Sequence, residues 1–197
     1  MADVFVLASA NPDKSKEIRA IFAELLPQAT LLPRPDEVPE VDETGRTLEE
    51  NARLKAVAIA AASGLPAVAD DTGLEVAALR GGPGVFSARY AGEHATYKEN
   101  VAKLLGSLVG VRDRRALFRT VAMVRWPDGR ELSAEGVSAG TIALTARGTT
   151  GFGYDPLFEP VEGGGLTFAE LGPEAKRQLS HRGRAFWALA AKLATEL

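Results

Sequence analysis

Two adjacent aspartates, Asp70 and Asp71, follow a short apolar run and precede Thr72. Successive strand residues point to opposite faces, so one carboxylate should face a site and the other support it, and spacing alone does not decide which. Carboxylate oxygens, completed by water and phosphate, are the ligands that Mg²⁺ accepts at nucleotide sites. Glu43, in an acidic loop before a helical pattern, is a further candidate ligand, although a surface carboxylate is the ordinary interpretation there.

The segment 9–14 lies where an apolar run changes to a helical pattern. A helix N-terminus presents backbone N–H groups and a partial positive charge, which together favour an anion. Ser9 and Asn11 add short hydrogen-bonding groups and Lys14 adds a full charge, so the segment suits the tail of a triphosphate. Lys55, on a second helical segment, offers another cation. A plain helix start and solvated lysines are the alternative interpretation.

Glycine and aromatic residues alternate in the segment 151–155. Phe152 and Tyr154 could stack on a nucleobase, and Asp155 could accept a hydrogen bond from a ring N–H. An aromatic-anchored structural loop is an equally good interpretation of the same residues.

Residues with hydrogen-bond donors mark the start of the last helical segment. His181 and Arg182 could donate to a carbonyl oxygen on a base, and Lys176 lies about one turn earlier. A lone histidine is more often structural than catalytic. The sequence has no cysteine, which excludes disulfides, thiolate metal sites and cysteine nucleophiles, and no nucleophile-elbow motif, which argues against acyl transfer.

The elements that must position these residues alternate between strand and helix patterns. Thr47 and Glu50 have the spacing of a capping box, and the segment 127–129 (Pro-Asp-Gly) is a hairpin turn signal. The patterns predict one α/β domain over residues 1–197 with a mixed sheet. The predicted strands are 4–8, 67–69, 74–78, 117–126, 130–134 and 141–144, and the predicted helices are 14–26, 47–64, 97–108, 173–179 and 182–196.

Composition limits the classes of partner. The chain has 197 residues, of which 46% are hydrophobic, and a net charge of -3. This charge argues against nucleic acid, because duplex-binding proteins present a strongly basic face. No apolar run approaches the ~20 residues that span a bilayer, and no signal-peptide pattern opens the chain. We therefore expect a cytoplasmic protein with neither a nucleic-acid nor a membrane partner.

Taken in order, these motifs resemble those of the inosine/xanthosine triphosphate pyrophosphatase family, which removes deaminated purine nucleotides from the precursor pool. The matching segments run over nearly the whole chain: Ser9-Ala10-Asn11-Pro12-Asp13-Lys14 with Glu17, Glu43-Thr44-Gly45, Glu50-Asn51-Ala52 with Lys55, Ala69-Asp70-Asp71-Thr72-Gly73-Leu74, Pro83-Gly84-Val85, Ser87-Ala88-Arg89-Tyr90, Gly151-Phe152-Gly153-Tyr154-Asp155-Pro156-Leu157-Phe158 and Ser180-His181-Arg182-Gly183.

The resemblance implies a long mixed β-sheet that forms the floor of a cleft between two α/β lobes, in a homodimer. It implies Mg²⁺-dependent hydrolysis of inosine, deoxyinosine and xanthosine triphosphates to the monophosphate and pyrophosphate. Glu43 and Asp71 would hold the metal, and Asp71 would also activate water. The implied substrate contacts are Ser9, Ala10, Asn11, Pro12, Asp13, Lys14 and Lys55 for the phosphates, Thr72 for the nucleotide, and Phe152, Gly153, Tyr154, Asp155, Lys176, His181 and Arg182 for the base.

Two positions depart from the family pattern. Ala10 stands where the family often has glycine, which restricts the backbone, and Thr72 stands where it often has serine. Two other functions compete with this one: a related pyrophosphatase for modified pyrimidine nucleotides, and a nucleotide-binding sensor without catalysis.

Overall fold

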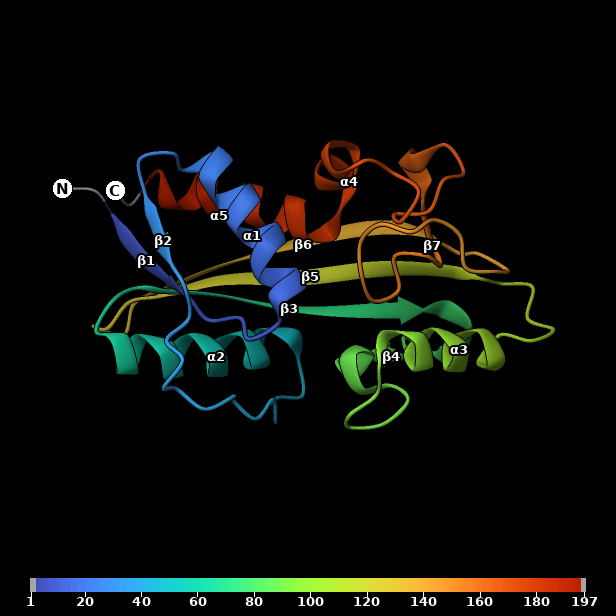
Figure 1. The fold of residues 1–197 in the computed structure, drawn as a ribbon, viewed down its shortest axis with the longest axis horizontal. Helices are drawn as coiled ribbons and strands as arrows, with labels where there is room; N and C mark the ends of the chain where they lie inside the picture. The colour runs from blue at the N-terminus through green and yellow to red at the C-terminus, as the bar shows by residue number, and fades with distance from the viewer. Residues whose placement is uncertain (1–2, 196–197) are drawn as a thin grey trace. The chain divides into compact units, whose positions relative to one another are not determined.

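The computed structural model describes residues 3–195 as a mixed α/β fold (Figure 1). Seven strands form one sheet in the order β2-β1-β3-β5-β6-β7, with β4 paired to β3. β1 is parallel to both β2 and β3, whereas β4 is antiparallel to β3 and β7 to β6, so the sheet is mixed, as the sequence predicts. The strands are β1 (Val4–Leu7), β2 (Thr30–Leu32), β3 (Ala67–Val76), β4 (Pro83–Gly84), β5 (Arg115–Arg125), β6 (Glu131–Ile142) and β7 (Phe158–Pro160).

Five α-helices and three 3-10 turns accompany these strands in the described residues. The α-helices are α1 (Pro12–Leu25), α2 (Leu48–Ser63), α3 (Tyr97–Ser107), α4 (Pro173–Leu179) and α5 (His181–Leu193), and the 3-10 turns are η1 (Ala77–Leu79), η2 (Ser87–Arg89) and η3 (Val161–Gly163). Within the described residues, none of these helices combines the length and the apolar character that a membrane span requires.

The chain divides into two compact units. The first unit comprises Met1–Asp71, Thr120–Gly136 and Arg182–Leu197. In this unit α1 and α5 lie on one face of the sheet and α2 on the other (Figure 1). Its core joins strand and helix residues such as Phe5 and Phe22, whose rings meet edge to face with centroids 5.4 Å apart.

The second unit comprises Thr72–Arg119 and Val137–His181. In this unit α3 and α4 cover opposite faces of the sheet (Figure 1). Its core contains an aromatic group in which the Phe118 ring lies 4.8 Å from that of Phe158 and 6.2 Å from that of Phe168. Each unit therefore has its own apolar core.

The helix starts that local sequence patterns predict lie close to the observed ones. Thr47 accepts the N–H of Glu50, and the side chain of Glu50 accepts the N–H of Thr47, which confirms the predicted capping box. α2 ends at Gly64, which adopts the left-handed conformation expected of a C-cap glycine. α5 ends at Leu193 and a turn follows at residues 194–195, so the predicted helix over 182–196 extends too far; Glu196 itself lies outside the described residues.

Strand boundaries differ more from prediction. β3 is one strand of ten residues rather than two short ones, so the two aspartates lie inside it rather than after it. β6 likewise includes the first half of the segment predicted as a separate strand at 141–144. The sequence does not predict β2, β4 or β7, which have only two or three residues each. Strands this short give too few residues for a period of two to be visible.

Candidate functional site

The start of α1 is fixed by Asn11. Its Oδ1 accepts the backbone N–H groups of Asp13, at 3.0 Å, and Lys14, at 3.1 Å, while Pro12 occupies the first turn and needs no acceptor for an N–H. Two of the N–H groups expected to meet a phosphate therefore already have an acceptor in this structure. The segment also carries the ammonium of Lys14, which lies 3.4 Å from Asp70 Oδ2 and 3.9 Å from Asp71 Oδ1.

The side chains of the two aspartates of β3 lie on opposite faces of the sheet. The side chain of Asp70 is fully buried, and its Oδ2 lies 3.3 Å from Arg182 Nε and 3.4 Å from Lys14 Nζ. Arg182 Nη1 in turn lies 2.5 Å from Glu17 Oε2. Lys14 and Glu17 come from α1 and Arg182 from α5, and these two helices share one face of the sheet. Asp70 is thus the supporting member of the pair.

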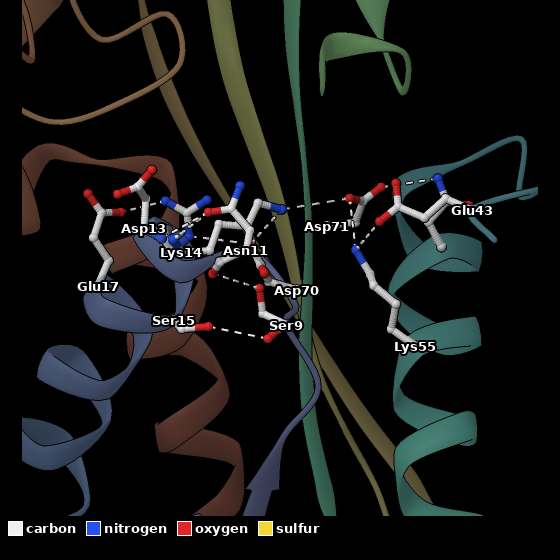
Figure 2. A network of polar contacts seen from close by, with 12 residues as sticks. Ser9, Asn11, Asp13, Lys14, Ser15, Glu17, Glu43, Lys55, Asp70 and Asp71 are labelled. Carbon is white, nitrogen blue, oxygen red and sulfur yellow. Dashed lines mark hydrogen bonds and ion pairs between the residues drawn. The ribbon is translucent and has the colours of Figure 1, made fainter. Parts of the chain in front are cut away.

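Asp71 points toward α2 (Figure 2). Its Oδ2 accepts a hydrogen bond from Asn51 Nδ2 at 3.2 Å, and its Oδ1 lies 3.1 Å from Lys55 Nζ. The same ammonium lies 2.7 Å from Glu43 Oε1. Lys14 Nζ reaches within 3.9 Å of Asp71 Oδ1 from the other side. We call Lys14, Glu43, Lys55, Asp70, Asp71 and Arg182 the charge cluster.

Asn51 is a further member of this site, to which the sequence assigned no role. Besides donating to Asp71, its Oδ1 accepts the backbone N–H of Gly45 at 2.8 Å. It therefore ties the loop that carries Glu43 to the strand that carries Asp71. A Cβ on Gly45 would come within 2.6 Å of Asn51 Oδ1, so the close approach requires glycine.

Opposite charges decide the ionisation of the cluster. Burial alone would lower the pKa of Lys55, but the negative charges of Asp71, Glu43 and Asp70 outweigh it and raise that pKa. Burial alone would raise the pKa of Asp70, but the charges of Lys14 and Arg182 hold it well below its usual range. Lys55 is therefore a cation and Asp70 an anion at neutral pH.

The donor set of the cluster suits a hard divalent cation only in part. Glu43 and Asp71 both reach the ammonium of Lys55, so two carboxylates converge on one positive charge. No group of three or more acidic or histidine side chains among residues 3–195 is placed to hold a metal ion. Mg²⁺ accepts one or two carboxylates when phosphate oxygens and water complete its octahedron. The pair fits Mg²⁺ under that condition.

A second group of residues surrounds the loop 151–155, which we call the aromatic loop. The N–H of Phe152 donates to Asp155 Oδ2 at 2.8 Å, and Lys176 Nζ lies 2.7 Å from the same oxygen. The ammonium also lies 5.1 Å from the centroid of the Phe152 ring. Gly151, with φ of +74°, lets the chain turn tightly around the carboxylate. Asp155 thus holds Phe152 in place. The expected hydrogen bond from a ring N–H of a nucleobase to Asp155 stays a prediction.

Two further side chains of this group, Tyr154 and His181, are deeply buried. Tyr154 packs in the core of the second unit, and its hydroxyl donates to the carbonyl oxygen of Ser87 at 2.9 Å. Burial raises the pKa of Tyr154. His181 stacks on Phe118 with ring centroids 4.4 Å apart. Of the two aromatic loop rings, Phe152 is therefore the one partly open to solvent.

The predicted site residues fall into these two groups. Those in the first unit are Ser9, Ala10, Asn11, Pro12, Asp13, Lys14, Glu43, Lys55, Asp71 and Arg182, and those in the second are Thr72, Phe152, Gly153, Tyr154, Asp155, Lys176 and His181. Ser9 is buried, and its Oγ donates to the carbonyl oxygen of Asn11 at 3.4 Å, so it shapes the turn before α1. The role of each residue toward a substrate remains a proposal.

The comparisons with known proteins cover the residues of both groups. A model of the Ham1 family matches residues 5–192. A protein of Synechococcus sp. named dITP/XTP pyrophosphatase is 48% identical over 191 residues, covering 96% of this chain and 89% of the relative. The solved structure of a HAM1 protein from Coxiella burnetii is 43% identical with a TM-score of 0.87, covering 99% of this chain and 100% of the other. The Staphylococcus aureus Ham1 protein is 42% identical with a TM-score of 0.86, covering 99% of this chain and 100% of the other.

Proposed function

The chain belongs to the Ham1 family, and we propose from this premise that it hydrolyses deaminated purine nucleoside triphosphates to the monophosphate and pyrophosphate. The substrates would be inosine, deoxyinosine and xanthosine triphosphates, and the activity would remove them before incorporation into DNA or RNA. The observation that carries the proposal is the charge cluster, in which Lys14 and Lys55 both approach Asp71 and Glu43 contacts the ammonium of Lys55.

The phosphate side of the proposal depends on the lysines. Lys14 and Lys55 lie on different helices, and both come within 4 Å of Asp71 Oδ1, at 3.9 Å and 3.1 Å. A triphosphate carries about four negative charges, so two fixed cations and the first turn of α1 would attract its tail. Ser9 to Asp13 would line this approach as part of the same turn.

Asp71 is the proposed base. Asn51 and Lys55 each hold one of its carboxylate oxygens, which fixes the orientation of the group. A carboxylate held in this way can orient a water molecule and accept its proton as the water attacks the α-phosphorus. The leaving pyrophosphate would take the charge that Lys14 and Lys55 stabilise. When bound, Mg²⁺ would be held by Glu43 and Asp71 and would neutralise part of the phosphate charge.

Recognition of the nucleobase would depend on hydrogen-bond donors. Hypoxanthine, xanthine and guanine carry a 6-oxo acceptor, whereas adenine carries a 6-amino donor. Lys176, His181 and Arg182 would supply donors to the oxo group, and the 6-amino group of adenine, itself a donor, would offer them no acceptor, at about 1–3 kcal/mol per mismatched group. Arg182 is 2% exposed and is held by Asp70 and Glu17, so its guanidinium needs little reordering to act. Phe152 and Thr72 would contact the nucleotide, with Gly153 and Asp155 shaping the loop.

The remaining parts of the proposal are a single functional domain over residues 1–197, dependence on Mg²⁺, a homodimer and a cytoplasmic location. Mg²⁺ dependence is supported by the convergence of Glu43 and Asp71. The dimer and the location are supported by the family resemblance alone. Dimerisation is testable by sedimentation of the purified protein.

A panel of nucleotides tests the proposed function. The purified protein is incubated with magnesium and with inosine, xanthosine, guanosine, adenosine and pyrimidine triphosphates, and pyrophosphate and orthophosphate are measured separately. We expect pyrophosphate chiefly from the inosine and xanthosine nucleotides. Pyrophosphate chiefly from modified pyrimidine nucleotides would replace the substrate class, and binding without any product would favour the sensor function.

A further inference from the structure

Tyr97 is held in a fixed position at the first turn of α3. The N-cap of this helix is Thr96, whose Oγ1 accepts the N–H of Glu99 at 3.3 Å, while Glu99 Oε2 accepts the N–H of Thr96 at 2.7 Å. This capping box fixes the backbone on both sides of Tyr97. The ring therefore projects from a rigid helix start rather than from a loop.

The ring of Tyr97 faces the aromatic loop. Its centroid lies 5.8 Å from that of Phe152, with the two planes inclined by 41°. This is the separation at which aromatic pairs attract each other in tilted arrangements. Tyr97 is nevertheless 40% exposed, so much of its surface has no protein cover. A single exposed aromatic residue is ordinary, but this one extends the surface of the one aromatic loop ring that is partly open to solvent.

Phe152 is itself held in a fixed position. Asp155 accepts its backbone N–H, and the Lys176 ammonium lies 5.1 Å from its ring centroid. Tyr97 and Phe152 thus form two adjacent rings, each fixed by hydrogen bonds of its own segment. Rings that are already ordered lose little side-chain freedom when a flat ligand binds against them.

We propose that Tyr97 is a nucleobase-binding residue that forms, with Phe152, the aromatic surface against which the purine base stacks. The inference rests on the proposed function and deepens it, since it assigns a base contact outside the motifs that carry the family resemblance. Stacking depends on the face of the base and not on its 6-substituent. Tyr97 therefore strengthens binding of purines in general, while discrimination between them lies with the hydrogen-bonding residues.

Two variants distinguish the effect of the aromatic ring from the effects of the hydroxyl group and of side-chain size. Tyr97→Phe keeps the ring, and Tyr97→Leu keeps an apolar side chain without an aromatic face. We expect Tyr97→Leu to raise KM for inosine triphosphate about tenfold, the size typical of losing one stacked ring, with kcat within twofold of the wild type. Tyr97→Phe should match the wild type. Thermal unfolding of all three proteins should agree, because the side chain is 40% exposed.

Inorganic tripolyphosphate is the matched probe because it has the phosphate tail and no base. Its inhibition constant against inosine triphosphate hydrolysis should be equal in all three proteins. An unchanged KM in Tyr97→Leu would overturn the inference, and so would a parallel loss of tripolyphosphate binding, which would indicate a structural role. If the wild type fails to hydrolyse any nucleotide, the proposed function is wrong. In that case the dissociation constant of inosine monophosphate is measured for the three proteins. Weaker binding by Tyr97→Leu alone would support the base contact, and equal binding by all three would overturn it.

Discussion

The buried ion pair between Asp155 and Lys176 should contribute measurably to stability. Lys176 Nζ lies 2.7 Å from Asp155 Oδ2, and the two side chains are 5% and 9% exposed for the acid and the amine. Removing one partner of a buried pair costs ~3–5 kcal/mol, because the other charge stays buried without its counter-charge. Asp155 also accepts the N–H of Phe152, which compensates part of its charge. We therefore expect Lys176→Met to cost ~3 kcal/mol, at the lower end of that range.

Asp155→Asn should cost a similar amount because it leaves the Lys176 ammonium buried opposite a neutral amide. The double variant removes both charges and should cost clearly less than the two single variants together, with a coupling of ~2 kcal/mol. Urea unfolding without nucleotide measures these values from the midpoint, provided that the slope stays constant. Both tryptophans, Trp126 and Trp187, lie in the first unit, so comparison of fluorescence with circular dichroism tests whether the two units unfold together.

The exposed ion pair between Asp113 and Arg115 provides the matched control. Its side chains are 46% and 77% exposed, and Arg115→Ala should leave the urea midpoint unchanged within error. If Lys176→Met and Asp155→Asn each cost less than ~1 kcal/mol, or if their effects simply add, the pair does not form in solution as the structure has it. The aromatic loop would then lack the support that our account of Phe152 requires.

Three further predictions concern single residues. Asp71→Asn should keep the fold and bind nucleotide but lose at least ~100-fold in kcat, and near wild-type turnover would show that another group is the base. Gly151→Ala should cost ~1–3 kcal/mol in urea unfolding, because φ is +74° and the new Cβ would meet the Asp155 carboxylate; unchanged stability would contradict this geometry. Burial alone would raise the pKa of Glu131, but Arg53 and Arg125 outweigh it and lower that pKa from 4.5. The contribution of the Glu131 carboxylate to stability is therefore full above about pH 4.5 and is lost as pH falls below it. The stability difference between wild type and Glu131→Gln, at most ~1 kcal/mol for these partly exposed groups, should shrink on acidification, and a growing difference would refute the sign.

Local features of the site could be predicted from the sequence. The Thr47 and Glu50 capping box depends on residues three apart, so spacing alone revealed it. The roles of Asp70 and Asp71 could not be assigned by spacing, because they depend on which helix covers each face of the sheet. The Arg182 to Glu17 contact spans 165 residues of sequence, and only the fold brings it together.

The aromatic loop shows the same limit. Its composition indicated a base-binding or structural loop, but composition does not say that Tyr154 would be buried while Phe152 remains partly open. His181 was marked as a donor, and its stacking on Phe118 follows from the core of the second unit rather than from any motif. Tyr97 gave no signal in the sequence beyond its place at a helix start, because its partner Phe152 lies far away along the chain.

Isotope labelling decides whether water attacks the α-phosphorus. Wild-type protein would hydrolyse inosine triphosphate with magnesium in water enriched in oxygen-18, and mass spectrometry would locate the label. We predict one labelled oxygen in inosine monophosphate and unlabelled pyrophosphate, because Asp71 directs water to the α-phosphorus. Label in pyrophosphate, or release of orthophosphate as the first product, would contradict the proposed reaction.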